Sequence, residues 1–218
     1  MPTLDQIRAA RALLNWSQSD LAERAGLSQT GIARIESGVN QPNVQTMEKI
    51  EISLRLAGIE FMGDHGVDKR SNSLLALSGQ SGLRQLYDDI YLALKLEGGD
   101  FLMSNVSQEL WEDNVGIEFA TAHRARMRGL NNFRMKAILR EGDENVAISD
   151  YCEFRWAEEK LYDTVTFCIY SNKLAFVVFN TDLPVTIYII QNSVIVNAYT
   201  RQFQALWDIA FIPPSHTS

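Results

Sequence analysis

The stretch Ser17–Gly38, SQSDLAERAGLSQTGIARIESG, constrains the fold of this chain more than any other. Ser17 is a typical helix N-cap, and Asp20 stands three residues later, as in a capping box. Gly26 is suited to end the helix that they start, because glycine adopts the left-handed conformation at little cost. The pattern therefore predicts a short helix over residues 18–25.

A second short helix follows after only two residues. Ser28 is its predicted N-cap, the helix covers residues 29–36, and Gly38 ends it. Apolar side chains at helical spacing predict the contact between the two helices: Leu21, Ala22, Leu27, Ile32 and Ile35. The segment thus predicts two helices that pack closely across a tight turn.

The polar face of the second helix is the candidate for recognition. Gln29, Thr30, Ala33 and Arg34 are left on the outside when the apolar residues face inward. Glutamine can pair in bidentate fashion with adenine, and arginine can do so with guanine. These residue types on one exposed face suit contacts with base edges in a major groove.

Further helices and a hairpin complete the first domain. The apolar spacing predicts a helix over residues 4–14, and Asn43 is the predicted cap of another that runs to Ala57. Two short extended runs flank the turn residues 63–66 and predict a β-hairpin. We therefore expect an all-α helix-turn-helix domain with a terminal hairpin over residues 1–70.

Residues 4–58 resemble the Cro/C1-type (XRE family) helix-turn-helix. The SQ opening, the L-A pair, G-L-S at the turn, I-x-x-I-E-x-G and the following P-N-V-x-T-M all occur in order. The resemblance implies that Gln29, Thr30, Ala33 and Arg34 read bases. It also implies contacts with the DNA backbone from a second set: Gln18, Ser28, Ser37, Asn40 and Gln41.

The resemblance has three further implications. Arg11 and Glu36 match positions that pair within the fold, so we expect a structural ion pair. Asn40 and Gln41 are neutral where many family members carry lysine or arginine, which predicts modest affinity for phosphates. Such domains usually dimerise, so that two recognition helices enter successive major grooves about 34 Å apart.

The charge of the chain is unevenly distributed. The 218 residues carry a formal net charge of −7, but residues 1–58 contain six Lys/Arg and six Asp/Glu, so the acid lies in residues 59–218. Acid away from the DNA surface disfavours non-specific binding, which depends on phosphate neutralisation. No apolar run reaches the roughly 18 residues of a membrane span, and the start of the chain does not fit a secretory signal. We expect a cytoplasmic protein without a membrane partner.

Cysteine and histidine are too sparse to predict a metal site or a cofactor. Cys152 and Cys168 follow no metal-ligand spacing, and the chain has three histidines. A reduced, buried pair is the favoured interpretation of the two thiols, with a redox switch as the alternative.

The second half of the chain predicts an α/β or α+β domain over residues 83–218, after a linker over residues 71–82 that is small, polar and loop-like. The predicted helices cover residues 82–96, 115–130 and 193–210, the last of them capped by Ser193. The predicted strands cover residues 101–106, 133–139 and 186–191, together with a hairpin around residues 171–173.

Residues 99–210 distantly resemble the phospholipase-D-like C-terminal domain of TrmB-type regulators. The best matching segments are TFCIYSNKLAFVVF, TIYIIQNSVIVNAY and RQFQALWDIA. The resemblance implies a degenerate phosphodiesterase fold that serves as an effector or assembly domain. Catalysis in that family needs an H-x-K-x4-D pattern, which is absent here, so we expect no catalytic residues and no enzyme.

Two groups of residues are candidates for binding an effector. Ser104 and Asn105 stand at the carboxyl end of a predicted strand, where α/β domains often bind ligands. His123, Arg124, Arg126 and Arg128 form a dense basic cluster. The cluster suits an anionic effector, but cations at the end of a helix also favour the helix dipole without any ligand.

The sequence thus favours a DNA-binding transcription regulator, a repressor in the leading interpretation, that binds a palindromic operator in double-stranded DNA as a homodimer. Its C-terminal domain would respond to a small-molecule or protein effector. Two alternatives stay open at this point: an antitoxin-like module that neutralises a protein partner and autoregulates, and a DNA-processing enzyme.

Overall fold

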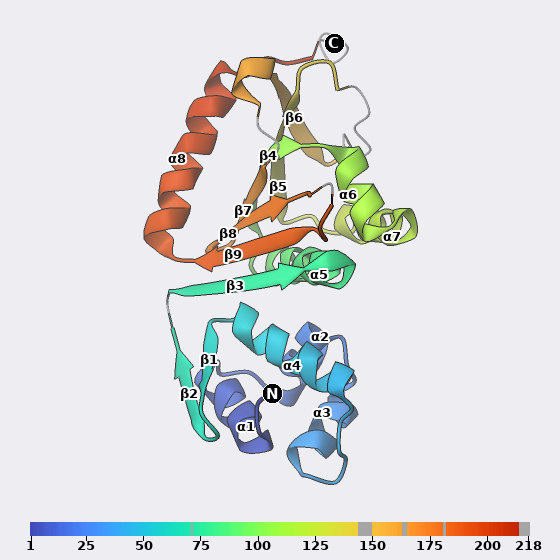
Figure 1. Cartoon of the computed structure of the whole chain (residues 1–218), viewed down its shortest axis with the longest axis vertical. Coiled ribbons are helices and arrows are strands. Elements are labelled where there is room, and N and C mark those ends of the chain that lie inside the picture. The colour runs from blue at the N-terminus through green and yellow to red at the C-terminus, as the bar shows by residue number, and fades with distance from the viewer. Residues whose placement is uncertain (71, 144–149, 163–164, 181, 214–218) are drawn as a thin grey trace. The chain divides into compact units, whose positions relative to one another are not determined.

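The computed structural model describes residues 1–70, 72–143, 150–162, 165–180 and 182–213. The chain divides into two compact units, Met1–Leu75 and Ala76–Ser218. The first unit is a helical bundle with a small hairpin, and the second is an α/β unit with a large mixed sheet (Figure 1). The predicted fold class, all-α followed by α/β, is confirmed.

Four helices form the first unit, and each begins at a residue whose side chain caps it. They are α1 (Leu4–Leu13), α2 (Gln18–Ala25), α3 (Gln29–Glu36) and α4 (Val44–Leu56), and the caps are Thr3, Ser17, Ser28 and Asn43. Ser17 and Asp20 form a capping box, because the Asp20 backbone N–H donates to the Ser17 hydroxyl and the Ser17 backbone N–H donates to the Asp20 carboxylate. The turn after α2 requires Gly26, whose φ of 62° lies in the left-handed region.

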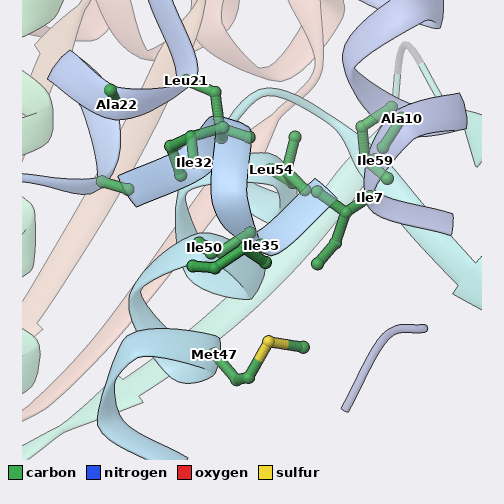
Figure 2. Packing of buried hydrophobic residues seen from close by; sticks show 11 residues of the cluster. Ile7, Ala10, Leu21, Ala22, Ile32, Ile35, Met47, Ile50, Leu54 and Ile59 are labelled. Atoms are coloured by element: carbon green, nitrogen blue, oxygen red, sulfur yellow. The ribbon is translucent and has the colours of Figure 1, made fainter. Parts of the chain in front are cut away.

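One apolar core holds the four helices together, as Figure 2 shows. Ile7 from α1, Leu21 from α2, Ile32 from α3 and Ile50 from α4 are all 0% exposed. Ala22, Ile35 and Leu54 complete the contacts, and Leu27 packs against them from the turn. The predicted contact between α2 and α3 is confirmed, and it fixes the angle at which α3 projects from the bundle.

Hydrogen bonds connect the hairpin to helix α1. Strands β1 (Ile59–Met62) and β2 (Gly66–Lys69) pair antiparallel, with Ile59 in the core cluster. The buried Gln6 side chain donates to the carbonyl oxygens of Gly63 and Gly66, at 3.0 and 2.9 Å. These bonds satisfy backbone groups of the turn that the strand ladder leaves free.

A seven-stranded sheet organises the second unit, in the order β3-β9-β8-β7-β4-β5-β6. Its strands are β3 (Ser73–Ser78), β4 (Gly99–Val106), β5 (Phe133–Arg140), β6 (Cys152–Ala157), β7 (Val165–Tyr170), β8 (Lys173–Val178) and β9 (Thr186–Gln191). Strands β4, β5 and β6 are parallel, whereas β7, β8 and β9 form an antiparallel meander that joins them at β4.

Helices cover both faces of this sheet (Figure 1). Helix α8 (Ser193–Ile209) packs its aromatic face, including Phe203 and Trp207, on one of them. Helix α5 (Gly79–Glu97) lies on the other, next to α6 (Gln108–Val115) and α7 (Ile117–Arg128). A short 3-10 helix covers Glu159–Leu161.

A buried polar network joins α5 to the hairpin of β7 and β8. The Asp89 carboxylate accepts from the Lys173 ammonium at 2.7 and 2.8 Å and from the Tyr170 hydroxyl at 2.7 Å. All three side chains are buried, so each depends on the others for its hydrogen bonds. The network fixes the orientation of α5 on the sheet.

The region between the domains differs from the expected loop. Within residues 71–82, Ser73–Ser78 form strand β3, and α5 already begins at Gly79. The strand is stabilised by pairing with β9, which lies far away in the sequence. The local sequence pattern therefore does not predict a strand at residues 73–78. The domain limits themselves stay predictions.

Two further details of the second unit correct the sequence-based expectations. The N-cap of α8 is Asn192 and not Ser193, because the Asn192 side chain accepts from the backbone N–H groups of Val194 and Ile195. Helix α6 was not expected. Its buried side chains, Trp111 and Val115, are one helical turn apart, which is the signal that would have revealed it.

The two cysteines are both buried and free, and they are too far apart to join. Cys168 is on β7 and Cys152 on β6, with β4 and β5 between them. At about 4.8 Å per strand the separation is roughly 14 Å, about twice the limit for a disulfide. Burial raises the pKa of each thiol to about 12.

In the part of the chain that the structure describes, no helix is long and apolar enough to cross a membrane.

Candidate nucleic-acid interface

Helix α3 offers an unobstructed polar surface. Gln29, Thr30 and Arg34 are exposed, and Ala33 is partly exposed beside them, while Ile32 and Ile35 point into the core. Among the described residues, the side chains of Gln29, Thr30 and Arg34 have no hydrogen-bond or ion-pair partner. An α-helix with its side chains is about 10–12 Å across, which fits within a major groove of about 12 Å width.

The start of α3 is fixed by its cap. The Ser28 hydroxyl oxygen accepts from the backbone N–H of Gly31 at 3.0 Å. The remaining N–H groups of the first turn stay available at the surface, where they favour a negatively charged group. Ser28 caps the helix and is also exposed. The residue predicted to contact the DNA backbone is therefore the same one that caps α3.

The end of α3 is held by a buried carboxylate. Glu36 is 3% exposed and accepts from Arg11 Nε at 2.8 Å and from Arg11 Nη2 at 3.0 Å. The expected Arg11–Glu36 ion pair is therefore confirmed. Arg11 also donates to the carbonyl oxygen of Trp16 at 2.8 Å, so the pair connects α1, the segment before α2, and α3.

Gln18 is part of the same network. Its side-chain amide donates to Glu36 Oε2 at 2.9 Å. Burial opposes ionisation of the Glu36 carboxyl, but the hydrogen bonds from Arg11 and Gln18 and the Arg11 charge outweigh it, and its pKa is lowered. Sequence reasoning placed Gln18 at the DNA backbone and missed this bond, which uses one of its two side-chain amide hydrogens. The second amide N–H and the backbone N–H are the groups of Gln18 that can donate to a phosphate.

The remaining predicted backbone contacts lie on the loop after α3. Ser37, Asn40 and Gln41 are all exposed. The loop is folded against the end of α3, since the Ser37 hydroxyl and the Asn40 backbone N–H both donate to the carbonyl oxygen of Arg34, each at 3.1 Å. The loop therefore has a defined position next to the exposed face of the helix.

A comparison with known families identifies the same part of the chain. Residues 7–58 match the family model described as Helix-turn-helix. The match covers α2, α3 and the turn between them, together with most of α1 and all of α4. A search of curated proteins gave no match to this chain.

Solved structures show only a loose likeness to the chain. NucT from Helicobacter pylori has a TM-score of 0.45 at 7% identity, covering 64% of this chain and 98% of that one. TrmBL2, an archaeal chromatin protein, has a TM-score of 0.43 at 14% identity, covering 84% and 67%. Nuc from Salmonella typhimurium, a phospholipase D family member, has a TM-score of 0.45 at 12% identity, covering 64% and 96%. The predicted likeness of residues 99–210 to a phospholipase-D-like domain stays a prediction.

The structure separates the predicted effector residues in the second unit. Ser104 and Asn105 are buried near β7, where the Asn105 side chain donates to the carbonyl oxygen of Val165 at 3.0 Å. Arg126 pairs with Asp88 and lies over the ring of Tyr91. Arg128 pairs with Asp150 at the surface. These residues do not gather around one site.

Two of the predicted effector residues, His123 and Arg124, line a pocket that lies between the sheet and helices α5, α6 and α7. Its volume is about 80 Å³, and most of its lining is aromatic or aliphatic. Sequence reasoning did not find the rest of the lining, such as Tyr87 and Trp111, because these residues come together only through the packing of three helices. No group of three or more potential metal ligands occurs among the residues that the structure describes.

Proposed function

We propose that the chain is a sequence-specific DNA-binding transcription regulator that reads its operator with helix α3. The observation that carries this proposal is the set of Gln29, Thr30 and Arg34 on the outer face of a capped helix, within the segment that matches the helix-turn-helix family model. Polar side chains of these types on a rigid helix are the groups that read base edges in a major groove.

The finer proposal is a homodimer on a palindromic operator that represses by occluding a promoter. One α3 helix offers few contacts, and two copies spaced by one turn of DNA would double them. The α/β unit would set the response to a signal, and the proposal includes no catalytic step.

The decisive experiment is a selection from a random double-stranded DNA library with the purified full-length chain. A palindromic consensus is expected. Arg34→Ala should then lose about 1–3 kcal/mol of binding free energy at one base position of each half-site and relax the preference there. Arg201→Ala, which removes an exposed arginine on α8, is the matched control and should leave the consensus unchanged. An equal loss on all DNA sequences after Arg34→Ala would show that α3 does not read bases.

A further inference from the structure

The pocket between the sheet and helices α5, α6 and α7 is lined mainly by apolar groups. Ile90 from α5, Phe101 and Met103 from β4, Met127 from α7 and Met135 from β5 supply much of its wall. Methionine side chains adapt to ligands of different shape, and aromatic rings offer flat contact surfaces. The lining therefore suits a compact apolar ligand.

Its volume limits the size of that ligand. The pocket holds about 80 Å³, whereas an engineered cavity of about 150 Å³ binds benzene and a single water needs about 10–15 Å³. The space exceeds the need of one water but is about half of the benzene-binding cavity, so a ring of roughly six or seven heavy atoms would be enclosed only in part and would extend into the open side of the pocket.

One hydrogen-bond donor in the lining lacks an acceptor. The indole Nε1–H of Trp111 is buried and has no hydrogen-bond partner in the described part of the chain, and Trp111 is 5% exposed. Its ring is held edge-on to Tyr87 at 5.3 Å and to Phe179 at 5.7 Å. An unsatisfied buried donor is unfavourable, so an acceptor on a ligand that reached it would offset that cost.

The charged groups of the lining compensate one another. Arg124 forms an ion pair with Glu112 at 2.5 Å. His123 accepts from Arg126 at Nδ1, and burial together with the charges of Arg126 and Arg124 lowers its pKa to about 3, so the ring is neutral at physiological pH. Neither an anion nor a cation finds a free counter-charge among these groups.

We propose that this pocket binds a small, uncharged, mainly apolar compound whose hydrogen-bond acceptor, such as a carbonyl oxygen, meets the Trp111 indole N–H. The binding itself is independent of DNA, whereas its meaning as a regulatory signal rests on the proposed function.

The test uses full-length chain labelled with ¹⁵N, in which the four tryptophans give four indole N–H resonances. Cyclohexanone is titrated as the probe, and methylenecyclohexane, which has the same shape without the acceptor, is titrated beside it. We expect a saturable downfield shift of the Trp111 resonance with the ketone and no downfield shift with the alkene. The absence of a saturable shift with cyclohexanone, as when the pocket holds only water, would overturn the proposal.

Two matched substitutions assign the resonances and test the contact. Trp111→Phe should weaken cyclohexanone binding about 2- to 10-fold more than it weakens methylenecyclohexane binding, the equivalent of one hydrogen bond. Trp207→Phe removes an equally buried indole from the opposite face of the sheet and should change neither affinity. Equal weakening of both probes by Trp111→Phe, or tighter binding of cyclohexylammonium or cyclohexanecarboxylate than of the ketone, would contradict the proposal. Because DNA is absent, these outcomes are separate from those of the operator selection.

Discussion

Glu36 illustrates how one residue can set the position of a recognition element. Its carboxylate is buried at the end of α3 and accepts from side chains on α1 and at the start of α2. A buried charge without partners would be strongly unfavourable, so the carboxylate is stable there only while Arg11 and Gln18 are in place. The network therefore couples the orientation of α3 to two other parts of the bundle.

Glu36→Gln is expected to destabilise the first unit by about 1–3 kcal/mol at neutral pH, because it leaves the Arg11 guanidinium without its counter-charge. Urea denaturation, followed at the transition of this unit, measures the change. Glu48→Gln, at an exposed position on α4, is the matched control and should have little effect.

The pH dependence gives the same prediction a second readout. The pKa of Glu36 is lower in the folded chain than its usual value of 4.5. Its contribution to stability is therefore fully present above that value and is lost as the pH falls through the folded pKa. The difference between the native chain and Glu36→Gln should shrink as the pH falls below about 4.5. A constant difference down to acid unfolding would show that ionisation of Glu36 does not matter.

At the scale of elements, the local signals of the first unit were sufficient, and those of the second were not. The caps at Ser17, Ser28 and Asn43 act within one helical turn, so the sequence could predict where α2, α3 and α4 begin. Strand β3 depends on β9, a distant partner, and carries no such signal. The exposed face of α3 depends on local signals and could be predicted. The pocket between the sheet and helices α5, α6 and α7 depends on contacts between distant segments and could not.

The cap of α3 provides the prediction at this scale. Ser28→Ala removes the acceptor for the Gly31 N–H and should cost about 0.5–2 kcal/mol of stability. Ser28→Asp keeps the cap, and its stability should stay close to that of the native chain, but it places a negative charge at the proposed phosphate contact.

DNA affinity should therefore fall for Ser28→Asp while its unfolding transition is preserved. Thermal unfolding and operator titration on the same samples separate the two effects. Ser19→Ala, inside α2 and exposed, serves as the control for loss of a hydroxyl. If Ser28→Asp bound the operator as tightly as the native chain does, Ser28 would not lie near a phosphate.

The charge distribution of the whole molecule determines how binding should respond to salt. Residues 1–58 carry no net charge, and the excess acid lies in the rest of the chain. Several arginines of the first unit are already engaged within it: Arg8 and Arg11 bond to Glu36, and Arg55 pairs with Glu51. All five proposed contacts with the DNA backbone are neutral residues, so few counterions would be released on binding.

The expected consequence is a shallow salt dependence. For a dimer in which Arg34 supplies the main cationic contact of each copy, the slope of log K against log salt should be roughly −2 to −4, compared with about −10 for a strongly basic DNA-binding protein. Asn40→Lys would add one cation to the loop beside α3 in each copy and should steepen the slope by about 2. Its affinity at low salt should rise on operator and random DNA alike, because a phosphate contact carries no sequence information.

Filter-binding or fluorescence-anisotropy titrations over a series of salt concentrations measure both the slope and the affinity, with Asn197→Lys on the exposed surface of α8 as the matched control. An unchanged slope for Asn40→Lys would place the loop after α3 away from the DNA, and a gain confined to the operator would mean that position 40 contacts a base.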